Sequence, residues 1–149
     1  MRLHARANDW RFLWIVLGIV VIDQLTKFFA SRIPLGTDIP LLGDFLALTH
    51  AQNTGAAFSM LQGQNIILAA ITIIILATIA WYYPKIKKEQ LVLVALITGG
   101  AMGNLIDRVR LGYVTDLIRI SIWPAFNVAD AAVTIGALVL AYHIIKEKR

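Results

Sequence analysis

The sequence predicts an all-α membrane protein in which four transmembrane helices carry a small extracytoplasmic β-rich cradle formed by two outer loops. Three observations lead to this fold class. Hydrophobic residues make up 58% of the 149 residues and charged residues only 15%, whereas a soluble domain carries about 25% charge. The apolar residues fall in four long runs, and Lys and Arg gather in alternate connections between them. We therefore expect one integral membrane domain spanning residues 1–149.

Each apolar run is close to the roughly 20 residues that a helix needs to cross a hydrocarbon core of about 30 Å. The runs extend from about Phe12 to Ala30, Ile66 to Tyr83, Leu91 to Ile106 and Val128 to Ile145, and the third is the shortest. The first run is longer than the apolar part of a secretory signal, about 7–15 residues, and no A-x-A box follows it. We interpret it as a retained membrane helix.

The positive charges predict the orientation of these helices. Three groups hold nine of the 14 Lys and Arg residues: Arg2, Arg6 and Arg11; Lys85, Lys87 and Lys88; Lys146, Lys148 and Arg149. Four crossings place all three groups on one side, which the positive-inside rule makes cytoplasmic. Both termini then lie inside, and the loops at about 31–65 and 107–127 face outward together.

The composition also excludes several kinds of catalytic and metal-binding site. The chain has no cysteine, which excludes disulfides, thiolate catalysis and Cys-ligated metal sites. The net charge of +5 comes from basic residues in the connections that we assign to the cytoplasmic side. Membrane orientation therefore accounts for this charge, and we expect no nucleic-acid partner. His4, His50 and His143 are expected on different sides of the membrane, and no H-E-x-x-H motif occurs. We therefore predict neither a metal nor another cofactor.

The two outer loops carry strand signals. The first contains IPLLGDFLALTHAQNTGAAFSML, with turn residues at Gly43-Asp44 and Asn53-Thr54-Gly55, and the second contains the β-branched, partly alternating GYVTDLIRISIW. Such patterns favour short strands over disorder. We expect the two loops to pair into a small sheet that lies against the membrane face.

Asp116 and Asp130 are the candidate catalytic residues. Acidic residues number only nine in the chain. Inserting a carboxylate at the centre of a membrane helix costs about 2.5–3.5 kcal/mol, so an acid retained within a membrane usually has a function. Two carboxyl groups held close together share one proton. The charged member can activate a water while the protonated member polarises an amide carbonyl, which hydrolyses a peptide bond without metal or covalent intermediate.

Structural alternatives exist for each candidate. Asp130 lies at the third position of a helix capped by Asn127 and could only cap it, and Asp116 could pair with Arg108 or Arg119. Asp23 and Lys27 have the spacing of a helical ion pair, although Lys27 could extend to the interface instead.

Further residues have supporting interpretations or compete with the acid pair. Asn104, Asp107 and Arg108 end the third apolar run, where we expect them to fix the loop, with Arg108 binding a backbone carbonyl or a carboxylate. Gly99 and Gly103 predict close helix packing. Lys27 and Ser31 are also four residues apart, which suggests a Ser-Lys hydrolase as an alternative. We do not favour it, because no evident oxyanion site lies near them in the sequence.

Five motifs occur in order along nearly the whole chain. They are Asp23-Gln24-Leu25-Thr26-Lys27, Asn53-Thr54-Gly55-Ala56-Ala57-Phe58-Ser59, Gly103-Asn104-Leu105-Ile106-Asp107-Arg108, Gly112-Tyr113-Val114-Thr115-Asp116 and Phe126-Asn127-Val128-Ala129-Asp130-Ala131. With these motifs the chain resembles the lipoprotein signal peptidases, or signal peptidases II. Leu117 and Ala131 depart from the Phe and Ser that often follow the two acids in that family.

The resemblance implies a four-helix aspartyl endopeptidase of the bacterial inner membrane that cleaves signal peptides just before the diacylglyceryl-modified cysteine of prolipoproteins. It implies Asp116 and Asp130 as the catalytic pair, inhibition by globomycin, and contact with membrane lipids. The positions matched to supporting roles are Asp23, Asn53, Gly55, Asn104, Arg108 and Asn127. We expect a monomer with its active site near the outer face. A different class of function, a small proton-coupled transporter or ion-conducting protein, would use the same intramembrane acids as a relay.

Overall fold

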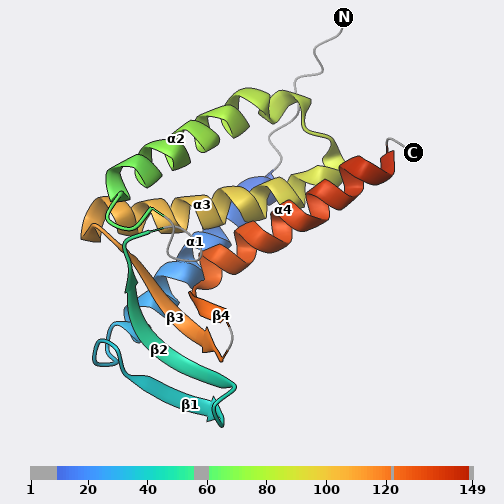
Figure 1. Ribbon diagram of the computed structural model, residues 1–149. Helices are drawn as coiled ribbons and strands as arrows, with labels where there is room; N and C mark the ends of the chain where they lie inside the picture. Colours follow the sequence, from blue (N-terminus) through green and yellow to red (C-terminus); the bar gives the residue numbers. More distant parts are fainter. Residues whose placement is uncertain (1–9, 56–60, 122, 148–149) are drawn as a thin grey trace, which may run out of the picture.

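The computed structural model describes residues 10–55, 61–121 and 123–147, and within these ranges it confirms the predicted fold class. Four helices are long and apolar enough to cross a membrane, and a four-stranded antiparallel sheet lies at one end of them (Figure 1). The helices are α1 (Trp10–Ala30), α2 (Asn65–Tyr82), α3 (Leu91–Leu111) and α4 (Val128–Glu147), and the strands are β1 (Asp38–Leu42), β2 (Leu46–Asn53), β3 (Val114–Ile120) and β4 (Trp123–Phe126). Two short 3₁₀ turns, η2 (Tyr83–Lys85) and η3 (Lys88–Gln90), connect α2 to α3.

The third helix is longer than the sequence predicts. Its expected end was about Ile106, yet α3 continues to Leu111 and equals α1 in length, at 21 residues. The added turn carries Asp107 and Arg108, whose charges end the apolar run without ending the helix. Gly112 ends it, because this residue adopts a left-handed conformation (φ +82°) that glycine tolerates and its N–H donates to the Arg108 carbonyl.

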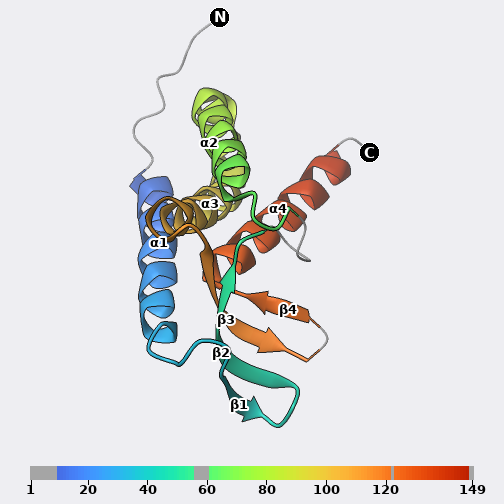
Figure 2. The ribbon, with the colours of Figure 1, turned by 60° about the vertical axis from the view of Figure 1, so that its left-hand side comes forward.

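Helix α3 occupies the middle of the bundle and packs against α1, α2 and α4 (Figure 2). Its glycines allow this approach, as the sequence predicts. A Cβ atom at Gly99 would lie 2.8 Å from the Cβ of Ile19, and one at Gly103 would lie 2.5 Å from Oδ2 of Asp23. Both distances are too short for real contacts, so the α1–α3 interface requires glycine at these two positions.

The predicted pairing of the two outer loops is confirmed. The sheet order is β1-β2-β3-β4, and β2 from the first loop pairs with β3 from the second, with Ala51 opposite Asp116. A bulge interrupts β2 between Leu48 and Ala51. Bulges bend a strand and re-aim side chains, and this one lies directly before the pair that contains Asp116.

The end of the bundle opposite the sheet carries the clustered positive charges. Arg11 lies in the first turn of α1, Lys85, Lys87 and Lys88 lie between α2 and α3, and Lys146 lies in the last turn of α4 (Figure 1). An ion pair between Lys87 and Glu147, with Nζ and Oε2 2.5 Å apart, joins two of these segments. The remaining predicted basic residues, Arg2, Arg6, Lys148 and Arg149, lie outside the described residues, as do His4 and the segment 56–60.

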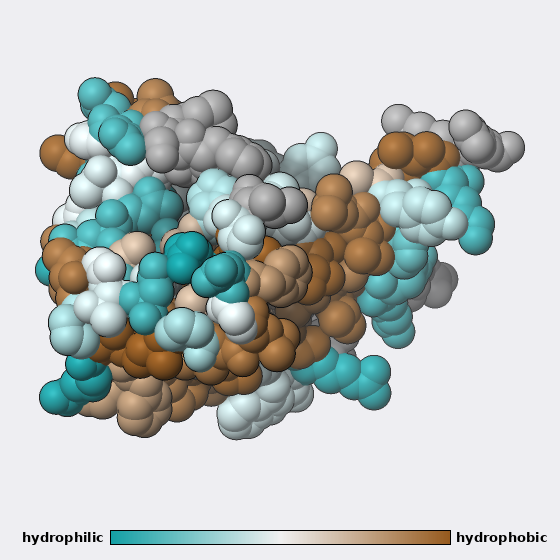
Figure 3. Space-filling model, turned by 60° about the horizontal axis from the view of Figure 1, so that its bottom comes forward, coloured by the Kyte–Doolittle hydropathy of each residue, from teal (hydrophilic) through white to brown (hydrophobic). Residues whose placement is uncertain are grey.

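The outward faces of the helices are apolar. Large side chains such as Trp14, Phe29, Ile66 and Leu138 are more than 60% exposed, which suits contact with lipid rather than water. Toward the sheet end, hydrophilic residues gather into patches beside a broad hydrophobic area (Figure 3). The polar groups that remain buried are concentrated where α1, α3, α4 and β3 meet, and they form the site described next.

Candidate active site

Asp116 is the third residue of β3 and is 2% exposed. Each of its carboxylate oxygens accepts a hydrogen bond from an asparagine side chain. Nδ2 of Asn127 donates to Oδ1 at 2.7 Å, and Nδ2 of Asn53 donates to Oδ2 at 3.1 Å. These donors come from the start of α4 and the end of β2, so three segments distant in the sequence fix one carboxyl group.

Asp130 lies in the first turn of α4 and also receives two donors. Nδ2 of Asn104 donates to Oδ1 at 2.8 Å, and the backbone N–H of Asn127 donates to Oδ2 at 3.2 Å. The Asp130 backbone N–H in turn donates to Oδ1 of Asn127 at 2.8 Å. This reciprocal pattern is a capping box. The capping interpretation of Asp130 is therefore confirmed, and it accounts for only one of the two carboxylate oxygens.

The two acids lie in one site. Asn127 contacts both of them, because its side chain donates to Asp116 while its backbone N–H donates to Asp130. Both acids line a cleft of about 990 Å³ between α2, α3, α4 and the sheet. Asn53, Gly55, Asn104 and Arg108 line the same cleft, so the structure brings most of the predicted site residues together.

The surroundings of Asp116 favour its protonated form. Burial raises the pKa of Asp116 to about 7, and the negative charge of Asp130 contributes to this rise. Hydrogen bonds from Asn53 and Asn127 and the positive charge of Lys27 oppose it. A carboxyl group that keeps its proton up to about neutral pH, beside a second acid, has the properties of a shared-proton pair.

Arg108 has the predicted supporting contact. Its Nη2 donates to the carbonyl of Gly55 at 3.2 Å and thereby connects α3 to the segment that follows β2. Nδ2 of Asn65, at the start of α2, donates to the Arg108 carbonyl at 3.0 Å. Arg119, the other proposed partner of Asp116, instead pairs with Asp38 at the far side of the sheet, 2.9 Å between Nη2 and Oδ2.

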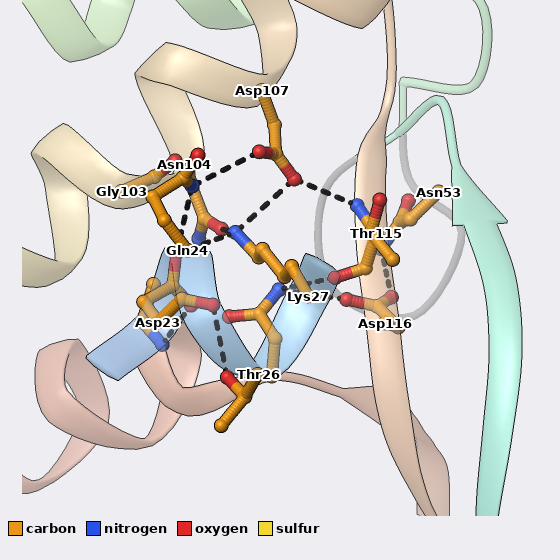
Figure 4. A network of polar contacts seen from close by, with 12 residues as sticks. Asp23, Gln24, Thr26, Lys27, Asn53, Gly103, Asn104, Asp107, Thr115 and Asp116 are labelled. Atoms are coloured by element: carbon orange, nitrogen blue, oxygen red, sulfur yellow. Dashed lines mark hydrogen bonds and ion pairs between the residues drawn. The ribbon is translucent and has the colours of Figure 1, made fainter. Parts of the chain in front are cut away.

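Asp23 and Asp107 lie behind the cleft rather than in it. Together with Lys27 they form a buried group that we call the acid–lysine cluster (Figure 4). Nζ of Lys27 lies 2.8 Å from Oδ2 of Asp23 and 3.2 Å from Oδ2 of Asp107, and it donates to Oδ1 of Asn104 at 2.9 Å. The expected Asp23–Lys27 ion pair is confirmed, whereas extension of Lys27 to the interface is wrong, because this residue is only 4% exposed.

Two features of this network were not predicted. Gln24 donates through Nε2 to Oδ1 of Asp107 at 3.0 Å and to the Gly103 carbonyl at 3.2 Å, and no pattern in the sequence predicts these contacts. Lys27 was expected to pair with Asp23, to extend to the interface or to act with Ser31, but its contacts with Asp107 and Asn104 were not expected. The spacing of four residues between Asp23 and Lys27 predicts their ion pair. The contacts of Lys27 with α3 depend instead on how α1 packs against α3.

The Ser-Lys hydrolase alternative does not fit the contacts. All three acceptors within reach of Nζ of Lys27 are Asp and Asn oxygens, and Oγ of Ser31 donates to the Phe28 carbonyl of its own helix at 2.7 Å. The lysine is therefore bound to the acid–lysine cluster and not positioned to activate Ser31.

Comparison with known proteins agrees with this arrangement. The family model described as "Signal peptidase (SPase) II" matches residues 15–146. The chain is 42% identical over 136 residues to a lipoprotein signal peptidase of Caldanaerobacter subterraneus subsp. tengcongensis, covering 88% of this chain and 93% of that protein. It is 38% identical over 138 residues to one of Halothermothrix orenii, covering 91% and 95%. A solved bacterial membrane enzyme superposes with a TM-score of 0.89 at 32% identity, covering 95% of this chain and 91% of that one.

Proposed function

Because the chain belongs to the lipoprotein signal peptidase family of aspartic peptidases, which cleave the signal peptides of prolipoproteins, we propose that Asp116 and Asp130 are its catalytic pair. The observation that carries the proposal is the convergence of both acids on Asn127 at the wall of one cleft. Three acids of the membrane helices, Asp23, Asp107 and Asp130, lie at the sheet end, whereas Glu89 and Glu147 lie at the opposite ends of the spans, so none of these acids lies at mid-depth. A transporter relay would spread them through the membrane depth, so the peptidase is favoured.

In the proposed reaction the pair holds one proton. The ionised carboxylate takes a proton from a water molecule as its oxygen attacks the scissile carbonyl, while the protonated carboxyl donates to the carbonyl oxygen. The tetrahedral intermediate collapses when the amide nitrogen receives a proton from the pair and the C–N bond breaks. One hydroxyl of the intermediate returns its proton to the pair as the C–N bond breaks, so the products are a carboxylic acid and an amine and the pair again holds one proton. Asn53, Asn104 and Asn127 hold the four carboxylate oxygens in place through this exchange.

The cleft has the composition that a lipid-modified peptide needs. Its polar wall carries the two acids, Asn53 and Arg108, and its apolar wall extends along the membrane helices through Ile75 of α2, Ile97 of α3 and Ile135 of α4. We propose that acyl chains of a diacylglyceryl cysteine contact this apolar wall while the peptide crosses the acids. We propose that Gly55, which lines the cleft and has no side chain, allows a peptide backbone to approach there. A globomycin-like peptide would inhibit by occupying the same space.

We further propose that the protein lies in the bacterial inner membrane with both termini cytoplasmic and the sheet on the outer side. The support is the gathering of Arg11, Lys85, Lys87, Lys88 and Lys146 at the end opposite the sheet, together with the positive-inside rule. Residues of a single chain provide a donor for each of the four carboxylate oxygens, and we propose a single-domain monomer as the active unit.

A purified-protein assay tests this function. The full chain in lipid or detergent is expected to cleave a synthetic prolipoprotein peptide with a diacylglyceryl cysteine, and mass spectrometry should place the cut immediately before that cysteine. The same peptide with an unmodified cysteine is the matched control and should be cleaved far more slowly, because it lacks the chains that contact the apolar wall. Equal cleavage of both peptides would contradict the proposed lipid recognition.

The acid pair also predicts a pH dependence. Because the pKa of Asp116 lies at about 7, the pair keeps its shared proton below that pH and loses it above. We expect kcat/KM, which reports the free enzyme, to fall as pH rises through about 7. Asp38→Asn, at the distant sheet edge, should leave this limb of the profile unchanged. A kcat/KM that stays constant between about pH 6 and 9 would contradict the shared-proton pair.

A further inference from the structure

The acid–lysine cluster has a completed set of hydrogen bonds. A lysine ammonium has three donors and no acceptor, and Nζ of Lys27 has three acceptors around it: Oδ2 of Asp23, Oδ2 of Asp107 and Oδ1 of Asn104. The three residues of the cluster are at most 4% exposed. Buried charge is costly unless every member is paired, so a network this complete holds its members in one arrangement.

The contact with Asn104 extends the network to the catalytic pair. An asparagine amide presents an acceptor on one side and two donors on the other, and its hydrogen-bond partners decide which side faces which neighbour. The ammonium of Lys27 can only donate, so it requires the oxygen of Asn104. The amide nitrogen then points to Asp130 and donates to its Oδ1 at 2.8 Å. Lys27 thus determines which group Asn104 offers to Asp130.

The two acids of the cluster bind the backbone next to each catalytic acid. Oδ2 of Asp107 accepts the N–H of Thr115 at 3.0 Å, and Oδ1 of Asp23 accepts the N–H of Ala129 at 2.9 Å. Thr115 immediately precedes Asp116, and Ala129 immediately precedes Asp130. Lys27 lies between the two carboxylates, so β3 and the start of α4 are both fixed relative to one side chain of α1.

We propose that Lys27 is a positioning residue of the peptidase, which sets the orientation of the Asn104 amide and holds the backbones that carry the two catalytic acids. The inference rests on the proposed catalytic pair. Lys27 lies behind the cleft, whose wall is formed by Asn104 and Asp130 themselves. Loss of Lys27 should therefore impair the chemical step more than substrate binding.

The test uses a double variant, Lys27→Met with Asp107→Asn, in the full chain with the diacylglyceryl peptide. The cluster carries a formal charge of −1 before the change, from one Lys and two Asp residues, and −1 after it, from Asp23 alone. An asparagine oxygen at position 107 can still accept the Thr115 N–H. The fixed orientation of Asn104 is what the variant removes. We expect kcat to fall about 10²-fold, the loss that a misplaced catalytic group produces, with KM near its original value.

Lys27→Arg provides a second variant that keeps the positive charge. The planar guanidinium cannot direct three donors from one nitrogen toward converging acceptors, so we expect a smaller loss of kcat, a folded protein and an unchanged KM. If the double variant does not fold, the kcat of Lys27→Arg alone tests the positioning role of Lys27. Thr26→Val is the matched control on the same helix, because Oγ1 of Thr26 donates only to carbonyls of α1, those of Ile22 and Asp23, and it should keep the original kcat.

Activity is compared per folded molecule, with the folded fraction taken from thermal unfolding. Original kcat values in both Lys27 variants would overturn the inference, and so would a loss that only follows the folded fraction or that appears in KM alone. Asp116→Asn in the same assay separates the two proposals. If it is inactive while the Lys27 variants are fully active, the catalytic pair stands and the positioning role fails. If it is active, the catalytic pair itself fails.

Discussion

Replacing Asp116 or Asp130 by Asn is expected to lower kcat by about 10⁴-fold, at the upper end of what one general acid or base contributes. An amide cannot take the proton of the attacking water, and it cannot share a proton with the remaining acid. Both variants should stay folded, because Asn retains the shape of the side chain and removes a charge from a buried site. Cleavage of the diacylglyceryl peptide and thermal unfolding should be measured on the same preparations.

In both variants the amide nitrogen of the new Asn would face a donor, because all four carboxylate oxygens of the pair accept hydrogen bonds. At position 116 both carboxylate oxygens accept from asparagine NH₂ groups, so the new amide nitrogen must face another donor. The side-chain amide of Asn127 cannot rotate to present its oxygen to the new Asn, because that oxygen already accepts the Asp130 N–H. Asp38→Asn, an exposed acid paired with Arg119, serves as control and should retain full activity. Turnover within about tenfold of the original by either active-site variant would refute its assignment.

Gly103→Ala should have the second large effect. The added Cβ would lie 2.5 Å from Oδ2 of Asp23 and 3.3 Å from the Cβ of Ala129. Asp23 cannot withdraw, because Lys27 and the Ala129 N–H hold its oxygens. We expect a loss of about 1–3 kcal/mol in the free energy of unfolding, typical of an overpacked interior. Cleavage should also be strongly reduced, because α4 carries Asp130.

Gly18→Ala is the matched control for this prediction. It makes the same substitution inside α1, where a new Cβ has no atom within 4 Å, and the higher helix propensity of Ala should stabilise the protein by roughly 0.5–1 kcal/mol. Unfolding in denaturant and cleavage rates on both variants provide the comparison. Equal stability of the two variants would mean that the α1–α3 contact at Gly103 is looser than the structure describes.

The sequence predicted the elements whose signals are local. Long apolar runs predicted all four helices, and the β-branched residues of the outer loops predicted their pairing. The end of α3 was wrong because Asp107 and Arg108 lower the hydropathy of a turn that remains helical. The only local signal for that end is Gly112, whose left-handed conformation stops the helix.

In the candidate site, too, some residues could be predicted from local patterns and others could not. Asp116 and Asp130 could be proposed from the sequence because buried acids are rare, and Asn127 as the cap of α4 follows from local spacing. The role of Lys27 could not be predicted, since its contacts to Asp107 and Asn104 span 80 and 77 positions of the chain. Such contacts depend on how α1 and α3 rotate against each other, which no local pattern specifies.

The capping box at the start of α4 has a mechanical consequence. Asp130 is at once a proposed proton carrier and the residue whose carboxylate oxygen holds the Asn127 N–H. A negative side chain stabilises a helix N-terminus more than a neutral one, so each protonation of Asp130 loosens that attachment and each release restores it. If Asp130 carries the proton, we therefore expect each proton transfer to weaken and then restore the hydrogen bond that caps the first turn of α4.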